Sequence, residues 1–222
     1  MRLHEKYRPQ TLADVCGQAT GILKQLVLSH RSAAVLLEGP TGCGKTTTAH
    51  ALAREMGVYA DPLMGIFGPE IISGADLTAN KVRELLGEGS PFRYARLGFH
   101  VLLIEELEDL HPQTQRLCKD LFERRLTEWN LLIVATSNDT SRLETALLHR
   151  FHPHVRFDGG SCFRQACLAR MRYVWQQETD APTPEDGTLL HWGTYDGGFS
   201  MRLALDRMES TLAIQRQNFA AA

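Results

Sequence analysis

The sequence has no long hydrophobic run, and its first residues, MRLHEKYRPQ, contain no apolar segment of the kind found in a signal peptide. A membrane-spanning helix would need roughly 20 consecutive, predominantly apolar residues. We therefore expect a soluble intracellular protein, located in the cytoplasm or associated with a nucleoid or nucleus.

Cysteine is scarce, and neither sign of charge is in clear excess. The five cysteines are odd in number and irregularly spaced, which argues against a disulfide framework or a zinc site and fits a reducing compartment. The formal net charge is −2 and the pI is about 6.5, so no global basic field attracts nucleic acid or membranes. Any contact with DNA must therefore come from a local patch or from several copies acting together.

What the sequence does have is an alternation of short apolar runs with longer amphipathic stretches. This pattern is typical of an α/β fold, in which helices connect the strands of a parallel sheet. Segments 101–104 (VLLI) and 131–135 (LLIVA) are apolar at every position, as expected of central strands covered on both faces. The predicted strands are 34–38, 70–73, 100–104, 131–136 and 155–157.

The predicted helices between these strands have recognisable ends. A helix over 45–56 is followed by Gly57, a residue type favoured just after helix C-termini. A helix over 77–86 has Asp76 as its expected N-cap. A third helix is predicted over 112–126.

The composition changes at residues 158–160 (DGG), which we interpret as a hinge. After it no strand-like run is present, and the patterns are helical. We therefore expect an α/β nucleotide-binding domain over 1–157 and a small helical lid domain over 161–217. The helices predicted in the lid are 163–177, 184–192 and 200–214.

The clearest motif follows the first predicted strand and precedes a helix. The segment GPTGCGKT at 39–46 satisfies the phosphate-binding pattern G-x-x-x-x-G-K-[ST]. Its glycines let backbone N–H groups converge on phosphate oxygens at a helix N-terminus. Lys45 brings charge to the β- and γ-phosphates, and the Thr46 hydroxyl can bind Mg²⁺. We therefore predict a site for ATP and Mg²⁺ formed by Gly39, Pro40, Thr41, Gly42, Cys43, Gly44, Lys45, Thr46 and Thr47.

Two adjacent carboxylates follow the predicted strand 100–104. Because ligands bind at the carboxyl ends of parallel strands, Glu105 is predicted to face the Mg²⁺ and Glu106 to orient the attacking water. An acidic, solvated helix start is the alternative explanation, and it is our interpretation of Glu108 and Asp109.

Several segments resemble AAA+ ATPases of the clamp-loader small-subunit type, including those of replication factor C and the bacterial DnaX-type loaders. EKYRP at 5–9 and DVCGQ at 14–18 match that family's opening signature. In the family this stretch surrounds the adenine and ribose, although an arm packed on the sheet would also account for it. The base-binding residues implied by the resemblance are Tyr7, Arg8, Pro9 and Val15.

Three more segments carry the resemblance. The strand end VATSN implies that Asn138 senses the γ-phosphate. HRF, twelve residues later, implies that Arg150 reaches the γ-phosphate of a neighbouring subunit. The segment at 197–206 resembles the lid helix and implies that Arg202 contacts nucleotide bound in its own chain. An ordinary polar strand end and exposed helix arginines are the alternative explanations.

This sequence also departs from the family. The common Asp-Glu pair is replaced by Glu105-Glu106, whose longer first arm would hold the metal less well and slow hydrolysis. The family's helical collar domain and the DnaX cysteine-rich zinc module are absent from the sequence. We then expect a stable pentamer to depend on AAA+ contacts and bound nucleotide; the alternative is that assembly needs other subunits.

The resemblance implies an ATP-hydrolysing, clamp-loader-like subunit in DNA replication or repair. Its expected partners are other AAA+ subunits in a ring or spiral, DNA, and a sliding clamp or helicase. Two alternatives remain open. One is a nucleotide-dependent DNA-binding adaptor, such as a helicase loader or a filament former. The other is a weakly active ATP-binding scaffold, which the unusual Glu105 would favour.

Overall fold

The computed structural model describes all residues except 18–19, 58–67, 91–98, 197 and 221–222. Its centre is a five-stranded parallel sheet with the order β2-β3-β4-β1-β5. The strands are β1 (Ala33–Glu38), β2 (Glu70–Ser73), β3 (His100–Glu105), β4 (Leu131–Ser137) and β5 (His154–Arg156). The α/β class and the five strand positions predicted from the sequence are confirmed.

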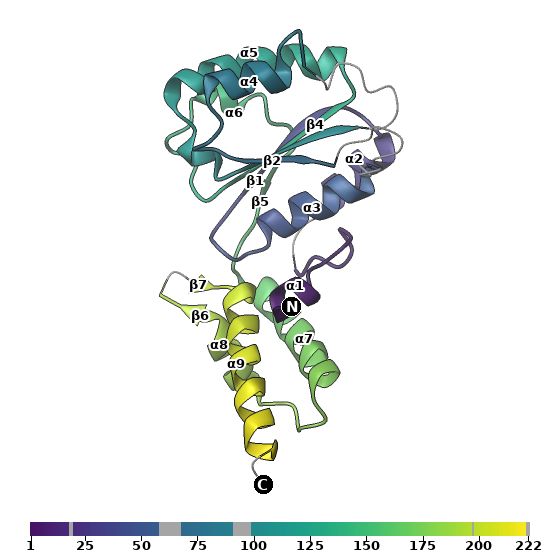
Figure 1. Cartoon of the computed structure of the whole chain (residues 1–222), viewed down its shortest axis with the longest axis vertical. Helices are drawn as coiled ribbons and strands as arrows, with labels where there is room; N and C mark the ends of the chain where they lie inside the picture. Colours follow the sequence, from purple (N-terminus) through teal and green to yellow (C-terminus); the bar gives the residue numbers. More distant parts are fainter. Residues whose placement is uncertain (18–19, 58–67, 91–98, 197, 221–222) are drawn as a thin grey trace.

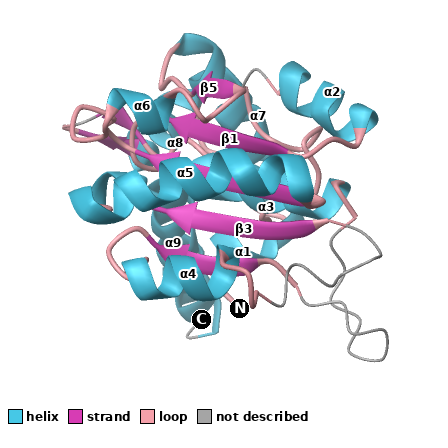
Figure 2. Ribbon diagram, turned by 90° about the horizontal axis from the view of Figure 1, so that it is seen from above, coloured by secondary structure: helices cyan, strands magenta, loops and turns pink. Residues whose placement is uncertain are grey.

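Helices cover both faces of this sheet (Figures 1 and 2). One face packs against α4 (Ala79–Leu86), α5 (Pro112–Glu128) and α6 (Thr145–Leu148), and the other against α2 (Gly21–Ser29) and α3 (Lys45–Glu55). Successive residues of the central strands enter the two cores alternately: Leu102 and Ile104 pack on one side, and Val101 and Leu103 on the other. This double coverage explains why the central strands are apolar at every position.

The other helices lie below the sheet in Figure 1. They are the short α1 (Leu3–Lys6), α7 (Ser161–Glu178), α8 (Asp186–Gly193) and α9 (Met201–Ala220). The N-terminal segment packs on this helical group: the Leu3 N–H donates to Glu209 on α9 (3.2 Å), and the Tyr7 hydroxyl donates to Glu178 on α7 (2.8 Å). None of the described helices is long and apolar enough to cross a membrane.

Local predictions were wrong in two places. The helix predicted from residue 77 begins at Ala79, and its N-cap is Thr78 rather than Asp76. The Asp76 and Leu77 N–H groups instead close a turn by donating to the Ser73 carbonyl. A small antiparallel hairpin, β6 (Thr194–Tyr195) and β7 (Gly198–Phe199), interrupts the helical region where no strand was predicted. Two residues per strand are too few to produce a readable alternation.

Helix ends were predicted more successfully than short helices. Gly57 follows α3 with a φ of 83°, the left-handed conformation expected of a residue at that position. The helices α1, α2 and α6 were not predicted. Two of them have only four residues, which is about one turn and too short for an apolar period to show.

Candidate nucleotide-binding site

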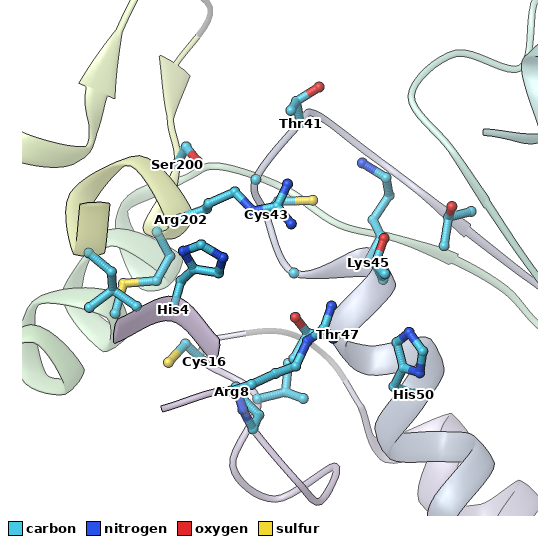
Figure 3. Close-up of a pocket in the computed structure, with 18 of the residues that line it drawn as sticks. His4, Arg8, Cys16, Thr41, Cys43, Lys45, Thr47, His50, Ser200 and Arg202 are labelled. Carbon is cyan, nitrogen blue, oxygen red and sulfur yellow. The ribbon is translucent and has the colours of Figure 1, made fainter. Parts of the chain in front are cut away.

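The carboxyl ends of β1, β3 and β4 open onto a pocket of about 660 Å³. Residues 3–16, here called the opening arm, and the first turn of α9 complete its walls (Figure 3). Most of the residues that the sequence singled out therefore lie around one space. Those that line the pocket are Tyr7, Arg8, Pro9, Val15, Thr41, Gly42, Cys43, Gly44, Lys45, Thr46, Thr47, Glu105, Glu106, Asn138 and Arg202.

Lys45 is the buried cation of this pocket, with 8% of its surface exposed. Its Nζ donates to the carbonyls of Gly39 (2.7 Å) and Pro40 (2.9 Å) and to Asn138 Oδ1 (2.9 Å). Gly39 and Pro40, which were also predicted to bind the nucleotide, do not line the pocket. Their carbonyl groups instead accept hydrogen bonds from Lys45. Burial lowers the pKa of Lys45, and the nearby acidic groups oppose that shift.

The phosphate-binding loop meets the beginning of α9 at Gly42. This residue has a φ of 80°, and a Cβ placed on it would lie 2.1 Å from the Ser200 hydroxyl. Only glycine permits both the conformation and the close approach. Arg202, in the first turn of α9, extends toward the loop (Figure 3). A cation from α9 and the loop therefore face the same space.

Glu105 and Glu106 lie at the end of β3, as predicted. Glu106 adopts a left-handed conformation, with φ 56° and ψ 55°, which is unusual for a residue with a side chain. Its N–H donates to the Thr136 hydroxyl at 3.3 Å. A Cβ on Gly74 would lie 2.2 Å from the Glu106 carbonyl oxygen, so a glycine there makes room for this turn.

Asn138 forms hydrogen bonds with the phosphate-binding loop and with the turn that follows β3. Its Oδ1 accepts from Lys45 and from the Thr41 hydroxyl (3.3 Å). Its backbone N–H and its Nδ2 both donate to Glu108 Oε1, at 3.0 and 2.8 Å. The interpretation of Glu108 as a merely solvated acidic residue was therefore wrong, whereas Asp109 is exposed.

Arg150 lies outside the pocket. Its Nη2 is 2.6 Å from Glu123 Oε2 on α5, and its side chain is partly exposed. The pocket of the same chain does not include it. That Arg150 acts on a neighbouring subunit stays a prediction.

A His–Asp pair in the wall of the pocket was missed by the sequence reasoning. His4 lines the pocket, and its Nδ1 lies 2.7 Å from Asp206 Oδ1 on α9. Asp206 follows Arg202 by four residues and so shares its helix face. The four-residue spacing from Arg202 was the only signal in the sequence that could have placed Asp206 near the site. Nothing in the sequence links Asp206 to His4.

The residues present fit an ATP-bound Mg²⁺. Thr46 and Glu105 both line the pocket, and they offer a hydroxyl and a carboxylate oxygen. Mg²⁺ prefers such hard oxygen ligands and usually takes only one or two from protein, the rest coming from phosphates and water. Thr46 and Glu105 are thus the residues that would hold the ion.

The pocket wall that contains Val15 also contains a thiol. Cys16 lines the pocket, and its pKa is lowered by a hydrogen bond from Cys167 on α7. Cys162 is exposed, whereas burial raises the pKa of Cys118 to about 12. Because thiolates react and thiols do not, these cysteines differ in reactivity.

We predict that a maleimide modifies Cys16 and Cys162 in the folded protein and leaves Cys118 unmodified. Magnesium-ATP at ten times its dissociation constant should slow labelling of Cys16 about tenfold, because only a tenth of the pockets are then free. Peptide mass spectrometry at timed intervals measures both rates, with Cys162 as the internal control. Equal labelling rates of Cys16 with and without ATP would show that the nucleotide does not cover this wall of the pocket.

Comparisons with known proteins identify the family and the fold of this chain. Residues 35–159 match the AAA family, described as "ATPase family associated with various cellular activities". The chain is 30% identical to mouse (Mus musculus) replication factor C subunit 5 over 210 residues, which cover 93% of this chain and 59% of that protein. It is 28% identical to the replication factor C small subunit of Aeropyrum pernix over 177 residues, covering 78% of this chain and 52% of that one. The chain thus spans only about half to three fifths of the length of these relatives.

Solved structures support the same fold. The Thermotoga maritima RuvB Holliday junction branch migration motor superposes with a TM-score of 0.68 at 19% identity, over 95% of this chain and 67% of that one. At that identity the likeness concerns the fold alone. The matched segment 35–159 contains the phosphate-binding loop, the two carboxylates and Asn138. This chain belongs to the AAA family of P-loop ATPases.

Proposed function

We propose that this chain binds and hydrolyses ATP as a subunit of a clamp-loader-like AAA+ assembly in DNA replication or repair. The observation that carries the proposal is the pocket in which the phosphate-binding loop, Glu105 and Glu106, Asn138 and Arg202 meet the opening arm. Similarity to replication factor C subunits over most of the chain supports the assembly and the DNA-related role. Other AAA+ subunits, DNA, and a sliding clamp or helicase are its proposed partners.

The proposal gives a role to most of the residues that the sequence singled out. The loop amides and Lys45 bind the β- and γ-phosphates, and Tyr7, Arg8, Pro9 and Val15 enclose the base. Bound Mg²⁺, held by Thr46 and Glu105, would neutralise charge on the phosphates. The Glu106 carboxylate accepts a hydrogen bond from the attacking water and orients it toward the γ-phosphorus. Arg202 contacts the nucleotide of its own chain, and Arg150 contacts that of a neighbour.

We also propose that residues 1–157 and 161–217 act as two units about the Gly159-Gly160 link. A nucleotide in the pocket would touch the sheet ends and the first turn of α9 at once. The contacts of the opening arm with α7 and α9 favour one refinement, in which this arm moves with the lid. Nucleotide binding would then fix the two units relative to each other.

ATP turnover in the presence of different partners tests this function. We expect slow hydrolysis by the isolated chain, because Glu105 reaches one methylene further than the usual aspartate. Primed DNA together with the source organism's sliding clamp should stimulate it. Size-exclusion chromatography with a non-hydrolysable ATP analogue should show a larger assembly than without nucleotide. Filaments on DNA without turnover would favour the adaptor alternative, and tight binding without turnover or DNA response would favour the scaffold.

A further inference from the structure

Glu108 is placed to control the orientation of the Asn138 side chain. It lies in the short 3₁₀ helix Leu107–Asp109 directly after β3, while Asn138 follows β4. The neighbouring Leu107 and Leu110 are fully or almost fully buried, so this turn is anchored on both sides of Glu108. The Glu108 side chain thus reaches Asn138 from a fixed piece of backbone.

The hydrogen bonds of the Asn138 side chain with Glu108 and with Lys45 determine which way the amide points. A carboxylate only accepts hydrogen bonds, so the group 2.8 Å from Glu108 Oε1 must be the Asn138 NH₂. The amide oxygen then faces the other way, where Lys45 Nζ (2.9 Å) donates to it. Exchanging the two ends of the amide would set oxygen against carboxylate and NH₂ against ammonium, and both contacts would become repulsive.

We propose that Glu108 is a positioning residue that presents the oxygen of Asn138, not its NH₂, to the phosphate pocket; this rests on the proposed ATP hydrolysis. A phosphate oxygen has no proton to give to that oxygen. Asn138 therefore acts through a proton donor, which is Lys45 or the attacking water, and does not donate to the γ-phosphate.

The consequence for hydrolysis is geometric. A water molecule has two O–H groups, and two acceptors for them line the pocket: the Glu106 carboxylate and, once the Lys45 ammonium turns from Asn138 to the phosphates, Asn138 Oδ1. When both O–H groups are held, a lone pair of the water oxygen is left to face the phosphorus. The oxygen–phosphorus bond then forms as the bond to the leaving ADP oxygen breaks, and a proton of the water passes to Glu106. Glu108 holds the second acceptor in place without touching the substrate.

The first test compares alanine and glutamine at position 108. Glu108→Ala should lower kcat about tenfold to hundredfold, the range for a lost hydrogen bond to a charged group, with the ATP dissociation constant within about threefold. Glu108→Gln keeps an acceptor oxygen and should recover most of the rate. Asp109→Asn, which removes an exposed carboxylate from the same turn, is the matched control and should leave kcat within about twofold. A Glu108→Ala variant that binds ATP and turns over like wild type would overturn the proposal.

The second test reverses the polarity of the pair. Asn138→Asp alone sets two carboxylates against each other and should reduce kcat strongly. Adding Glu108→Gln provides an amide that donates to the new carboxylate and leaves an oxygen facing Lys45, so the double variant should be at least about fivefold faster than Asn138→Asp. If the NH₂ of Asn138 instead served the γ-phosphate, the double variant would be no faster than the single one, and the proposal would fail.

A third measurement does not depend on turnover. In ¹⁵N-labelled protein, the side-chain NH₂ signals of Asn138 can be assigned by their loss in Asn138→Ala. They should exchange with water at least about tenfold faster in Glu108→Ala than in wild type, while Asp109→Asn leaves them unchanged. Unchanged exchange in Glu108→Ala would refute the positioning role. A wild-type protein that shows the protected NH₂ but never hydrolyses ATP would refute the proposed function and leave the positioning role standing.

Discussion

Replacing Lys45 by alanine is expected to abolish measurable nucleotide binding. The Lys45 ammonium is the buried positive charge nearest the loop, and the phosphates would lose their charge-assisted hydrogen bonds to it. Two such bonds at roughly 1.5–3 kcal/mol each correspond to a loss of about a hundredfold or more in affinity. Isothermal titration calorimetry with ATP and with ADP, both with Mg²⁺, measures the effect.

Controls separate lost binding from lost folding. Lys45→Ala leaves the Gly39 and Pro40 carbonyls without their shared donor, so the melting temperature of the variant must be compared with that of wild type. Lys24→Ala removes an exposed lysine from α2 and should bind ATP normally. An affinity of Lys45→Ala equal to that of wild type would show that the phosphates bind elsewhere.

Replacing Arg150 by alanine should leave ATP binding intact and lower hydrolysis in the assembled protein by about a thousandfold. An arginine supplied by a neighbour stabilises charge on the transferring phosphoryl group, and such residues contribute about 10³–10⁵ in rate. Arg150 does not line the pocket of its own chain, and it pairs with Glu123 on the surface of α5. The substitution should therefore leave the rate of ATP hydrolysis by the isolated subunit unchanged.

Mixing two inactive variants provides the sharper version of this test. Arg150→Ala retains an intact pocket, whereas Glu106→Gln retains the arginine, so mixed assemblies contain interfaces with both functional parts. They should regain activity that neither variant has alone. Arg172→Ala, which breaks another exposed ion pair, with Asp186, is the matched control and should hydrolyse ATP like wild type. Wild-type turnover by assembled Arg150→Ala, or no recovery on mixing, would contradict the role in trans.

The parts of the site that could be predicted are those whose chemistry is local in sequence. The phosphate-binding loop needs its glycines, Lys45 and Thr46 within eight consecutive residues. Glu105 and Glu106 were found because a carboxylate at the end of an apolar strand meets the same sheet edge as the loop. Arg202 and Arg150 were identified by resemblance alone, and their roles stay predictions.

Glu108 and the His4–Asp206 pair show where sequence reasoning stopped. Glu108 lies 30 residues from Asn138 in the chain, and His4 lies 202 residues from Asp206. Glu108 belongs to a run of acidic residues that resembles any solvated helix start. Its hydrogen-bond partner, Asn138, therefore cannot be inferred from the composition of that run. The Thr78 cap was missed for a similar reason, since the turn over Ser73 decides where the helix begins.

The sequence by itself determined the α/β architecture and the position of the phosphate-binding loop, because strand and helix periods and glycine-dependent turns are encoded within short segments. Only the tertiary structure decided that the opening arm packs on α7 and α9, that Arg150 lies outside the pocket of its own chain, and that Glu108 holds Asn138. The physical reason is that these contacts join residues far apart in the chain. Their energy depends on which side chains the packed sheet and helices bring within hydrogen-bonding distance, and neither spacing nor composition records that.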